Sequence, residues 1–169
     1  MVNRLSRRNA ILAGLACAAS SSSFAFADDV TSLVWADLLP EGEPVVPRAF
    51  AGLIDHSSEP LSSQQPASSG RRNDWNGKVV RLPGFVVPIE QSSKGVTAFI
   101  LVPYVGACVH VPPPPANQLV FVTAQKPFQV TGLFDAVNVT GMFGTASTYT
   151  HLAEIGYALS ADKIEAYSV

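Results

Sequence analysis

Residues 78–90 read KVVRLPGFVVPIE, a run of β-branched and aromatic residues that Pro83-Gly84 and Pro88 interrupt. The next apolar run, VTAFILVPY over residues 96–104, is continuous and of strand length. Both segments are predicted to be strands, because β-branched and aromatic side chains favour the pleated backbone. Proline and glycine inside such runs fit the bends and edges of a small barrel.

Three more segments continue this pattern toward the C-terminus: QLVFVTA over residues 118–124, PFQVTGLFDA over 127–136 and GYALSADKIEAYSV over 156–169. The last of them reads as two short strands around Ser160-Ala161-Asp162. About five short strands at this spacing are typical of a small barrel or sandwich. We predict a mostly β domain, specifically a small closed or partly open barrel like the oligonucleotide/oligosaccharide-binding (OB) fold.

The remaining segments predict a short helix and two loops. Residues 31–39, TSLVWADLL, place apolar residues at helical spacing behind a threonine cap, so a short helix or turn is expected there. Residues 40–76 are rich in Pro, Ser, Gln and Gly, and their centre, residues 57–70, is predicted to be a mobile loop. Residues 136–151, rich in Gly, Thr and Ser, are also predicted to be a loop between strands.

The N-terminus has the three parts of a bacterial signal peptide. Arg4, Arg7 and Arg8 form a positive start, an apolar run follows, and Ala25-Phe26-Ala27 offers small residues for cleavage. The paired arginines resemble a twin-arginine signal; general secretion, a lipid anchor at Cys17 and an N-terminal helix of the domain are the alternatives. We predict a periplasmic protein with a cleaved signal peptide over 1–27, a short helix plus flexible linker over 28–76 and a barrel over 77–169.

Composition excludes two classes of partner. The whole chain carries a formal net charge of −2, and removal of a signal peptide with three arginines makes it more acidic. An acidic domain with scattered charges gives no nucleic-acid signal. No later segment is long and apolar enough to span a membrane. We therefore expect neither nucleic-acid binding nor stable membrane insertion after cleavage.

Cys108 is the single cysteine of the predicted mature chain, so it has no internal disulfide partner. A lone thiol outside the cytoplasm is buried, bound to a metal or reactive. On an extended backbone Cys108 and His110 point to the same side, with Cα atoms about 6.6 Å apart. One Zn²⁺ or Cu⁺ ion bridges such a pair. Pro112, Pro113, Pro114 and Pro115 are predicted to hold the following backbone extended beside the pair.

Other interpretations of this segment stay open. Cys108 can be a small buried apolar side chain with His110 as its hydrogen-bonded neighbour. It can instead be a catalytic thiolate with His110 or His151 as base, but no Cys-x-x-Cys, G-x-S-x-G or H-E-x-x-H motif supports catalysis, and we expect no enzyme. Tyr104 and the prolines can form a peptide-binding surface. Further candidate ligands are His151, His56, Glu90, Asp135 and Glu154.

The two stretches GKVVRLPGFVVPIE, residues 77–90, and FILVPYVGACVHVPPPPANQ, residues 99–118, resemble the shared sequence of a family of exported bacterial domains of unknown function. Trp35–Pro40 and Val130-Thr-Gly132 resemble two further elements of that family. The resemblance implies a periplasmic location, with some members lipid-anchored and some encoded beside metal-uptake proteins and macrolide-exporter-like transporters. It carries over Cys108, His110 and Asn117 as site candidates.

We therefore expect a periplasmic accessory protein that binds Zn²⁺ or Cu⁺ through Cys108 and His110 and is linked to metal homeostasis or envelope transport. Its expected partner is an inner-membrane ABC-type transporter or a periplasmic metal-binding protein. The alternatives are a scaffold or binding module for such a transporter, with no metal, and a thiol-dependent enzyme.

Overall fold

The computed structural model describes residues 29–43 and 60–167; the predicted signal peptide and His56 lie outside them. Within this part the chain is mostly β, and no helix there is long and apolar enough to cross a membrane. The strands and 3₁₀ helices are β1 (Thr31–Ser32), η1 (Trp35–Leu38), η3 (Leu61–Gln64), β2 (Val79–Ser92), β3 (Gly95–Val102), η4 (Ala116–Gln118), β4 (Val120–Phe128), β5 (Ala136–Tyr149) and β6 (Glu154–Ala166).

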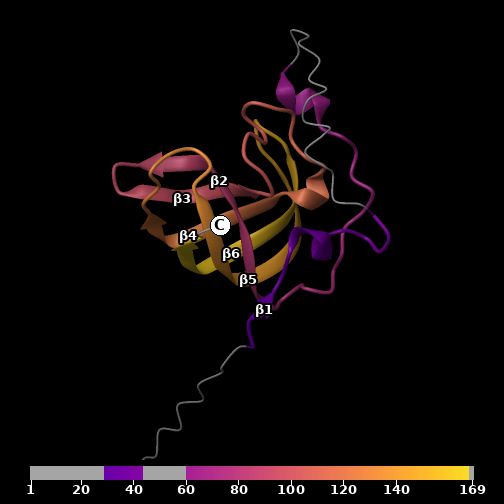
Figure 1. Ribbon diagram of the computed structural model, residues 1–169, viewed down its shortest axis with the longest axis horizontal. Helices are drawn as coiled ribbons and strands as arrows, with labels where there is room; N and C mark the ends of the chain where they lie inside the picture. Colours follow the sequence, from indigo (N-terminus) through magenta and orange to yellow (C-terminus); the bar gives the residue numbers. More distant parts are fainter. Residues whose placement is uncertain (1–28, 44–59, 168–169) are drawn as a thin grey trace, which may run out of the picture.

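The sheet closes into a five-stranded barrel, which confirms the predicted fold class. Its order is β2-β3-β4-β6-β5, and β5 pairs back to β2, while β1 adds to β2 from outside the ring. Neighbours are antiparallel except for β4 with β6 and β1 with β2. A closed order with the third and fifth barrel strands parallel is that of an OB-type barrel. In Figure 1 residues 29–43 and 60–76 run along one side of it.

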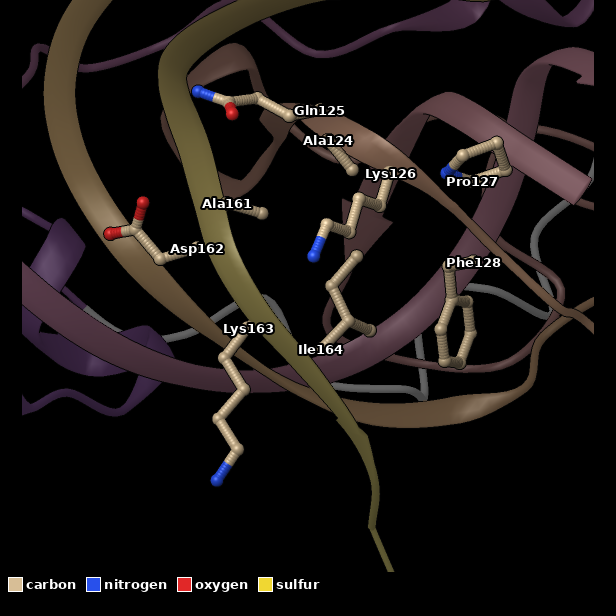
Figure 2. A pocket seen from close by; sticks show the side chains of 9 residues that line it. All are labelled: Ala124, Gln125, Lys126, Pro127, Phe128, Ala161, Asp162, Lys163 and Ile164. Atoms are coloured by element: carbon tan, nitrogen blue, oxygen red, sulfur yellow. The ribbon is translucent and has the colours of Figure 1, made fainter.

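β4 and β6 pair only from Val120 with Tyr157 to Ala124 with Ala161, and then the two strands part. β4 continues toward β3, where Phe128 pairs with Val96, and β6 continues beside β5. The gap between the separated ends is visible in Figure 2. The two strands therefore diverge along a short seam, while their paired residues keep the ring closed.

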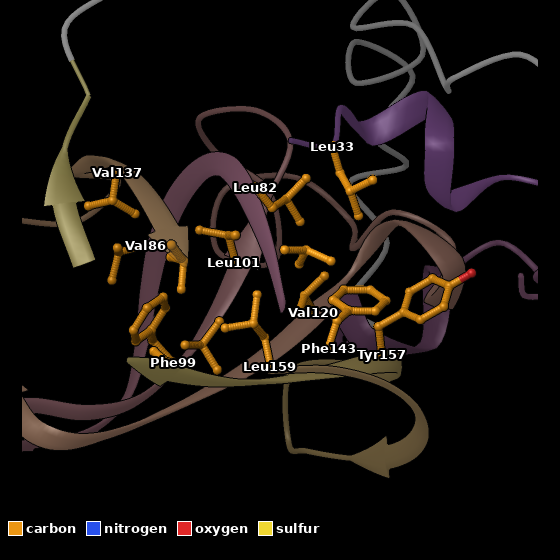
Figure 3. Close-up of a cluster of buried hydrophobic side chains, with 14 of the residues drawn as sticks. Leu33, Leu82, Val86, Phe99, Leu101, Val120, Val137, Phe143, Tyr157 and Leu159 are labelled. Atoms are coloured by element: carbon orange, nitrogen blue, oxygen red, sulfur yellow. The ribbon is translucent and has the colours of Figure 1, made fainter. Parts of the chain in front are cut away.

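The barrel interior holds the main core, which is drawn in part in Figure 3. Along β3, Phe99 and Leu101 point into this core, whereas Ile100 and Val102 belong to a second buried cluster. Alternate residues of a strand face opposite sides, so the second cluster covers the outer face of β3. β3 is buried on both faces, which explains why its sequence is continuously apolar rather than alternating.

The proline and glycine residues of β2 do not break it. The strand pairs with β5 up to Phe85 and with β3 from Phe85 onward, so Pro83 and Gly84 lie where it changes partner. A Cβ at Gly84 would lie 2.8 Å from Cγ of Leu101, so only glycine lets β2 approach β3 this closely.

The predicted loop over residues 136–151 is wrong, because residues 136–149 form strand β5. Its inward side chains, Val137, Val139 and Phe143, are buried in the main core. The threonines of the strand, Thr140, Thr145 and Thr148, are half-buried and β-branched, which suits a strand whose outer face meets water. A Cβ at Gly141 would overlap the carbonyl oxygen of Ser160, so the glycine serves close strand approach and does not mark a turn.

Two other strand boundaries differ from the prediction. The C-terminal segment is one strand, β6, because Ser160 and Ala161 pair with Thr123 and Ala124 of β4 in place of forming a turn. The predicted strand over residues 127–136 is not continuous. β4 ends at Phe128, and Asp135 accepts hydrogen bonds from the backbone N–H and the hydroxyl of Thr131, which closes a turn before β5.

Of the short helix or turn predicted for residues 31–39, the structure has the turn: strand β1 is followed by the single 3₁₀ turn η1. Leu33 and Leu38 are buried in the main core, and the indole N–H of Trp35 donates to the carbonyl of Pro83 at 2.8 Å. This segment before the predicted loop therefore supplies side chains to the barrel core. Its Asp37 carboxylate accepts from the N–H of Val34, which favours a tight turn over a longer helix.

The described part of the predicted mobile loop, residues 60–70, is anchored to the barrel by Gln65. The Gln65 amide donates to the carbonyls of Pro114 and Glu154 and accepts from the N–H of Glu154. The polar atoms of Gln65 pair with backbone groups outside the loop. This segment is therefore anchored to the domain although it has few apolar side chains to bury. We call residues 60–76 the strap.

Candidate functional site

The backbone at Cys108 forms a compact turn and not the extended segment that the sequence predicted. The N–H groups of Val109, His110 and Val111 all donate to the carbonyl oxygen of Gly106, at 3.3, 2.9 and 3.1 Å. Gly106 and Cys108 both have positive φ, at 96° and 66°. The predicted extended backbone is therefore wrong, and the spacing argument that paired Cys108 with His110 no longer applies.

The turn separates the surroundings of these two side chains. Cys108 is buried, with 2% of its surface exposed, in the apolar cluster outside β3. His110 is exposed, and its ring centroid lies 6.0 Å from that of Phe134. Burial raises the pKa of the Cys108 thiol to about 12, so the thiol is protonated at neutral pH. A protonated, buried thiol is a poor nucleophile, which weighs against thiol catalysis.

A pocket of about 280 Å³ brings Cys108 together with His151. Its walls come from three parts of the chain that are remote in sequence: Cys108 and Val109, His151 and Leu152, and residues 60–62 at the start of the strap. The turn that carries His151 is fixed by Thr150, whose hydroxyl accepts from the N–H groups of Leu152 and Ala153. Of the predicted ligands in the described residues, His151 is thus the one that shares a pocket with Cys108.

The acidic candidates lie outside that pocket. Asp135 closes the turn before β5, Glu154 accepts a hydrogen bond from Ser147, and Glu90 is exposed on β2. Among residues 29–43 and 60–167, no three His, Cys, Asp or Glu side chains gather in a way that could hold a metal ion. His56 belongs to the residues that the structure does not describe. The described ligand set is therefore one thiol and one imidazole.

The predicted peptide-binding surface is mostly interior. Pro113, Pro114 and Pro115 are buried, and Asn117 is 1% exposed with its amide donating to the carbonyl of Gly70 at 2.8 Å. Pro112 and Tyr104 are half-buried. The proline run supports the strap from inside the protein, so it does not form a free docking surface.

Sequence reasoning missed the strap as a part of the pocket. Residues 60–62 line it, and Gln65 and Asn117 hold the strap against the barrel. The available signal was the pair of amide residues, Gln65 within a Ser-rich stretch and Asn117 after the prolines. Amide side chains can hydrogen-bond to backbone N–H and C=O groups that are left without partners where an irregular segment packs on a domain.

The family to which this chain belongs is now clear. A family model described as "Protein of unknown function (DUF3299)" matches residues 35–166. The chain belongs to the DUF3299 family. A solved crystal structure of a DUF3299 family protein from Pseudomonas aeruginosa PAO1 is similar to it, with 34% sequence identity and a TM-score of 0.71 over 83% of this chain and 97% of that one. No curated protein matches the chain.

In this DUF3299 protein the Cys108 pocket lies on a face that other OB-type barrels use for ligands. The match begins at Trp35, in agreement with the core position of Leu38. OB-type barrels bind ligands on the face of their second and third strands, between the loops that follow the first and fourth. Here those strands are β3 and β4, and the loop after the fourth carries His151. The Cys108 turn covers this face, and the pocket lies where the turn meets the His151 loop.

Proposed function

We propose that this DUF3299 protein is an exported accessory protein that binds Zn²⁺ or Cu⁺ between the Cys108 thiolate and the His151 imidazole. The observation that supports it most is that these two side chains, remote in sequence, line one pocket at the ligand-binding end of an OB-type barrel. The analogy to other barrels supports only the location of the site. The argument for a metal ion comes from the residue types, a thiol and an imidazole. A soft thiolate with an imidazole suits both ions.

Metal binding would change the protonation of Cys108. Burial keeps its thiol protonated in the free protein, and a coordinating thiol is deprotonated by the metal. Each bound ion would therefore displace one proton from Cys108. The apolar neighbours Val109 and Leu152 would limit the access of water to one side of the ion. His151 would bind as the neutral imidazole through one ring nitrogen.

Two protein ligands suit an accessory role better than a structural one. A structural zinc site has four protein ligands, and the described residues offer two. An open coordination sphere leaves positions for ligands from the protein that delivers or receives the ion. We propose that this partner is a periplasmic metal-binding protein or an ABC-type transporter of the inner membrane.

The test is metal stoichiometry of the mature protein, purified from the periplasm without a metal-affinity tag. We expect one equivalent of zinc or copper, lost in Cys108→Ser and in His151→Ala. His110→Ala is the matched control, because His110 is exposed and does not line the pocket. Retention of the metal by both pocket variants would end the proposal. Loss in Cys108→Ser and in His110→Ala, with retention in His151→Ala, would restore the Cys108–His110 pair that the sequence predicted.

The strongest alternative is a metal-free scaffold for an envelope transporter. The specific observation in its favour is that Cys108 packs as an apolar side chain with Ile100, Val102 and Ile155. A transporter that co-purifies equally with the wild type and with Cys108→Ala, in the presence of chelator, would support the scaffold.

Export itself is tested by the mature N-terminus, which we expect at Asp28. We also expect export to be lost when Arg7 and Arg8 are both changed to Lys.

A further inference from the structure

The seam where β4 and β6 part leaves one backbone edge of β6 without a strand neighbour on that side. The last β4–β6 pair is Ala124 with Ala161, while β6 continues beside β5 to Ala166. A pocket of about 360 Å³ occupies the gap. Unpaired strand edges are templates for a further strand. The barrel already accepts one such addition elsewhere, because the short strand β1 pairs in parallel with β2.

The two sides of the gap differ in their capacity to bind a strand. β4 carries Pro127, which has no N–H to donate, and its pairing with β3 shifts register between Thr123 and Phe128. Proline and bulges protect an edge from strand addition. β6 has no proline between Asp162 and Ala166 and stays in regular register with β5 from Lys163 to Ala166. The edge of β6 is therefore the open one.

The side chains around the gap define the chemistry of its occupant. Phe128 and Ile164 pack against the main core and form an apolar floor. Figure 2 shows the Lys126 side chain reaching from β4 toward β6, while Asp162 and Lys163 point away from it. Lys163 is paired with Glu165 at 2.9 Å, and Lys126 has no carboxylate partner among the described residues. An unpaired ammonium beside an apolar floor is complementary to a carboxylate that is followed by an apolar side chain.

We propose that the edge of β6 from Asp162 to Ala166 binds an extended, acidic peptide segment of a partner protein by strand addition. Backbone hydrogen bonds to β6 would supply affinity, and alternate side chains would supply specificity. One apolar side chain of the segment would lie on Phe128 and Ile164, and an acidic one would meet Lys126. This site is separate from the Cys108 pocket and does not depend on metal binding.

The test uses ¹⁵N-labelled mature protein and two synthetic peptides, Ac-TEVEVET-NH₂ as the acidic probe and Ac-TKVKVKT-NH₂ as the basic one. We expect the acidic peptide to shift the amide resonances of residues 162–166 saturably. Lys126→Glu should weaken its binding roughly tenfold and should make the basic peptide the better ligand. Lys78→Glu makes the same charge change beside Trp75 and should alter neither affinity. Circular dichroism melting verifies that both variants are folded.

Three results would overturn this proposal. The first is that neither peptide shifts the amide resonances saturably at concentrations up to about 1 mM. A dissociation constant weaker than this would not count as specific binding. The second is binding that Lys126→Glu leaves unchanged, or shifts that map to the Cys108 pocket. The third is a dimer of the free protein in which the amides of residues 162–166 are protected from exchange, because a second copy would then be the occupant.

Discussion

The Tyr157 hydroxyl, buried in the barrel, donates a hydrogen bond to the carbonyl oxygen of Leu38 at 2.7 Å. The hydroxyl oxygen of Tyr157 in turn accepts from the backbone N–H of Arg72 at 2.8 Å. One side chain of the last strand therefore satisfies backbone groups of both η1 and the strap. It joins three parts of the sequence that a division into linker and barrel would separate.

We predict that Tyr157→Phe lowers the free energy of unfolding by about 1–3 kcal/mol, because it leaves the buried carbonyl of Leu38 and the partly buried N–H of Arg72 without this partner. The ring is retained, so its contact with Phe143, at 5.2 Å between centroids, should persist. Urea unfolding measures the change. Tyr149→Phe is the control, since Tyr149 is 75% exposed, and an equal loss in both variants would contradict the assignment.

Gly156 is predicted to be intolerant of a side chain. A Cβ there would lie 2.6 Å from the carbonyl oxygen of Ala116, so β6 and η4 would have to move apart. Gly156→Ala should destabilise the protein by at least about 1–3 kcal/mol, the usual cost of forced overpacking. Gly132→Ala is the matched control, because nothing lies within 4 Å of its added methyl group. Equal thermal midpoints for the two variants would refute the close approach.

Gln65→Ala is predicted to loosen the strap without unfolding the barrel. The change removes both hydrogen bonds of its amide nitrogen and the one that its carbonyl accepts from Glu154. Hydrogen exchange should accelerate at the Glu154 amide and change little at Phe99 in the barrel interior. Ser63→Ala, which alters a solvent-exposed bond to Pro60, should have no such effect. Unchanged protection at Glu154 in the Gln65 variant would contradict the anchor.

The Cys108 thiol is predicted to react slowly, with a rate that keeps rising with pH. Because burial raises its pKa from 9.0 to about 12, the thiolate fraction should increase tenfold per pH unit from pH 7 to 10 without a plateau. The unfolded thiol loses its proton first, so this group should lower the free energy of unfolding above pH 9. Alkylation rates with iodoacetamide check the first statement. A plateau near pH 9 would indicate an ordinary, accessible thiol.

The sequence was sufficient to predict the barrel but not its details. The continuous apolar run of β3 and the β-branched run of β2 carry their own strand signal. β5 has no such signal in its sequence. Its glycine Gly141 is explained only by the structure, in which β5 approaches Ser160 of β6 too closely for a side chain. Strand propensity depends on neighbouring strands, and glycine has the same sequence signal in a turn and in a close approach.

The candidate site shows the same limit. Cys108 could be singled out as an unpaired thiol from the sequence alone. That His151 shares its pocket could not be predicted. Three hydrogen bonds to Gly106 fold the Cys108 segment into a turn and leave His110 exposed, whereas His151 comes to the pocket from a loop between two other strands. Spacing along the chain predicts side-chain convergence only where the backbone conformation is known.

The most direct test of the account is the X-ray absorption spectrum of the metal-loaded mature protein at the zinc or copper edge. With zinc, we predict one sulfur scatterer at about 2.3 Å and one imidazole at about 2.0–2.1 Å, together with lighter atoms from solvent or a partner. The sulfur should disappear in Cys108→Ser and the imidazole in His151→Ala, and neither should change in His110→Ala. A spectrum without sulfur, the same in all variants, would contradict a metal site between Cys108 and His151.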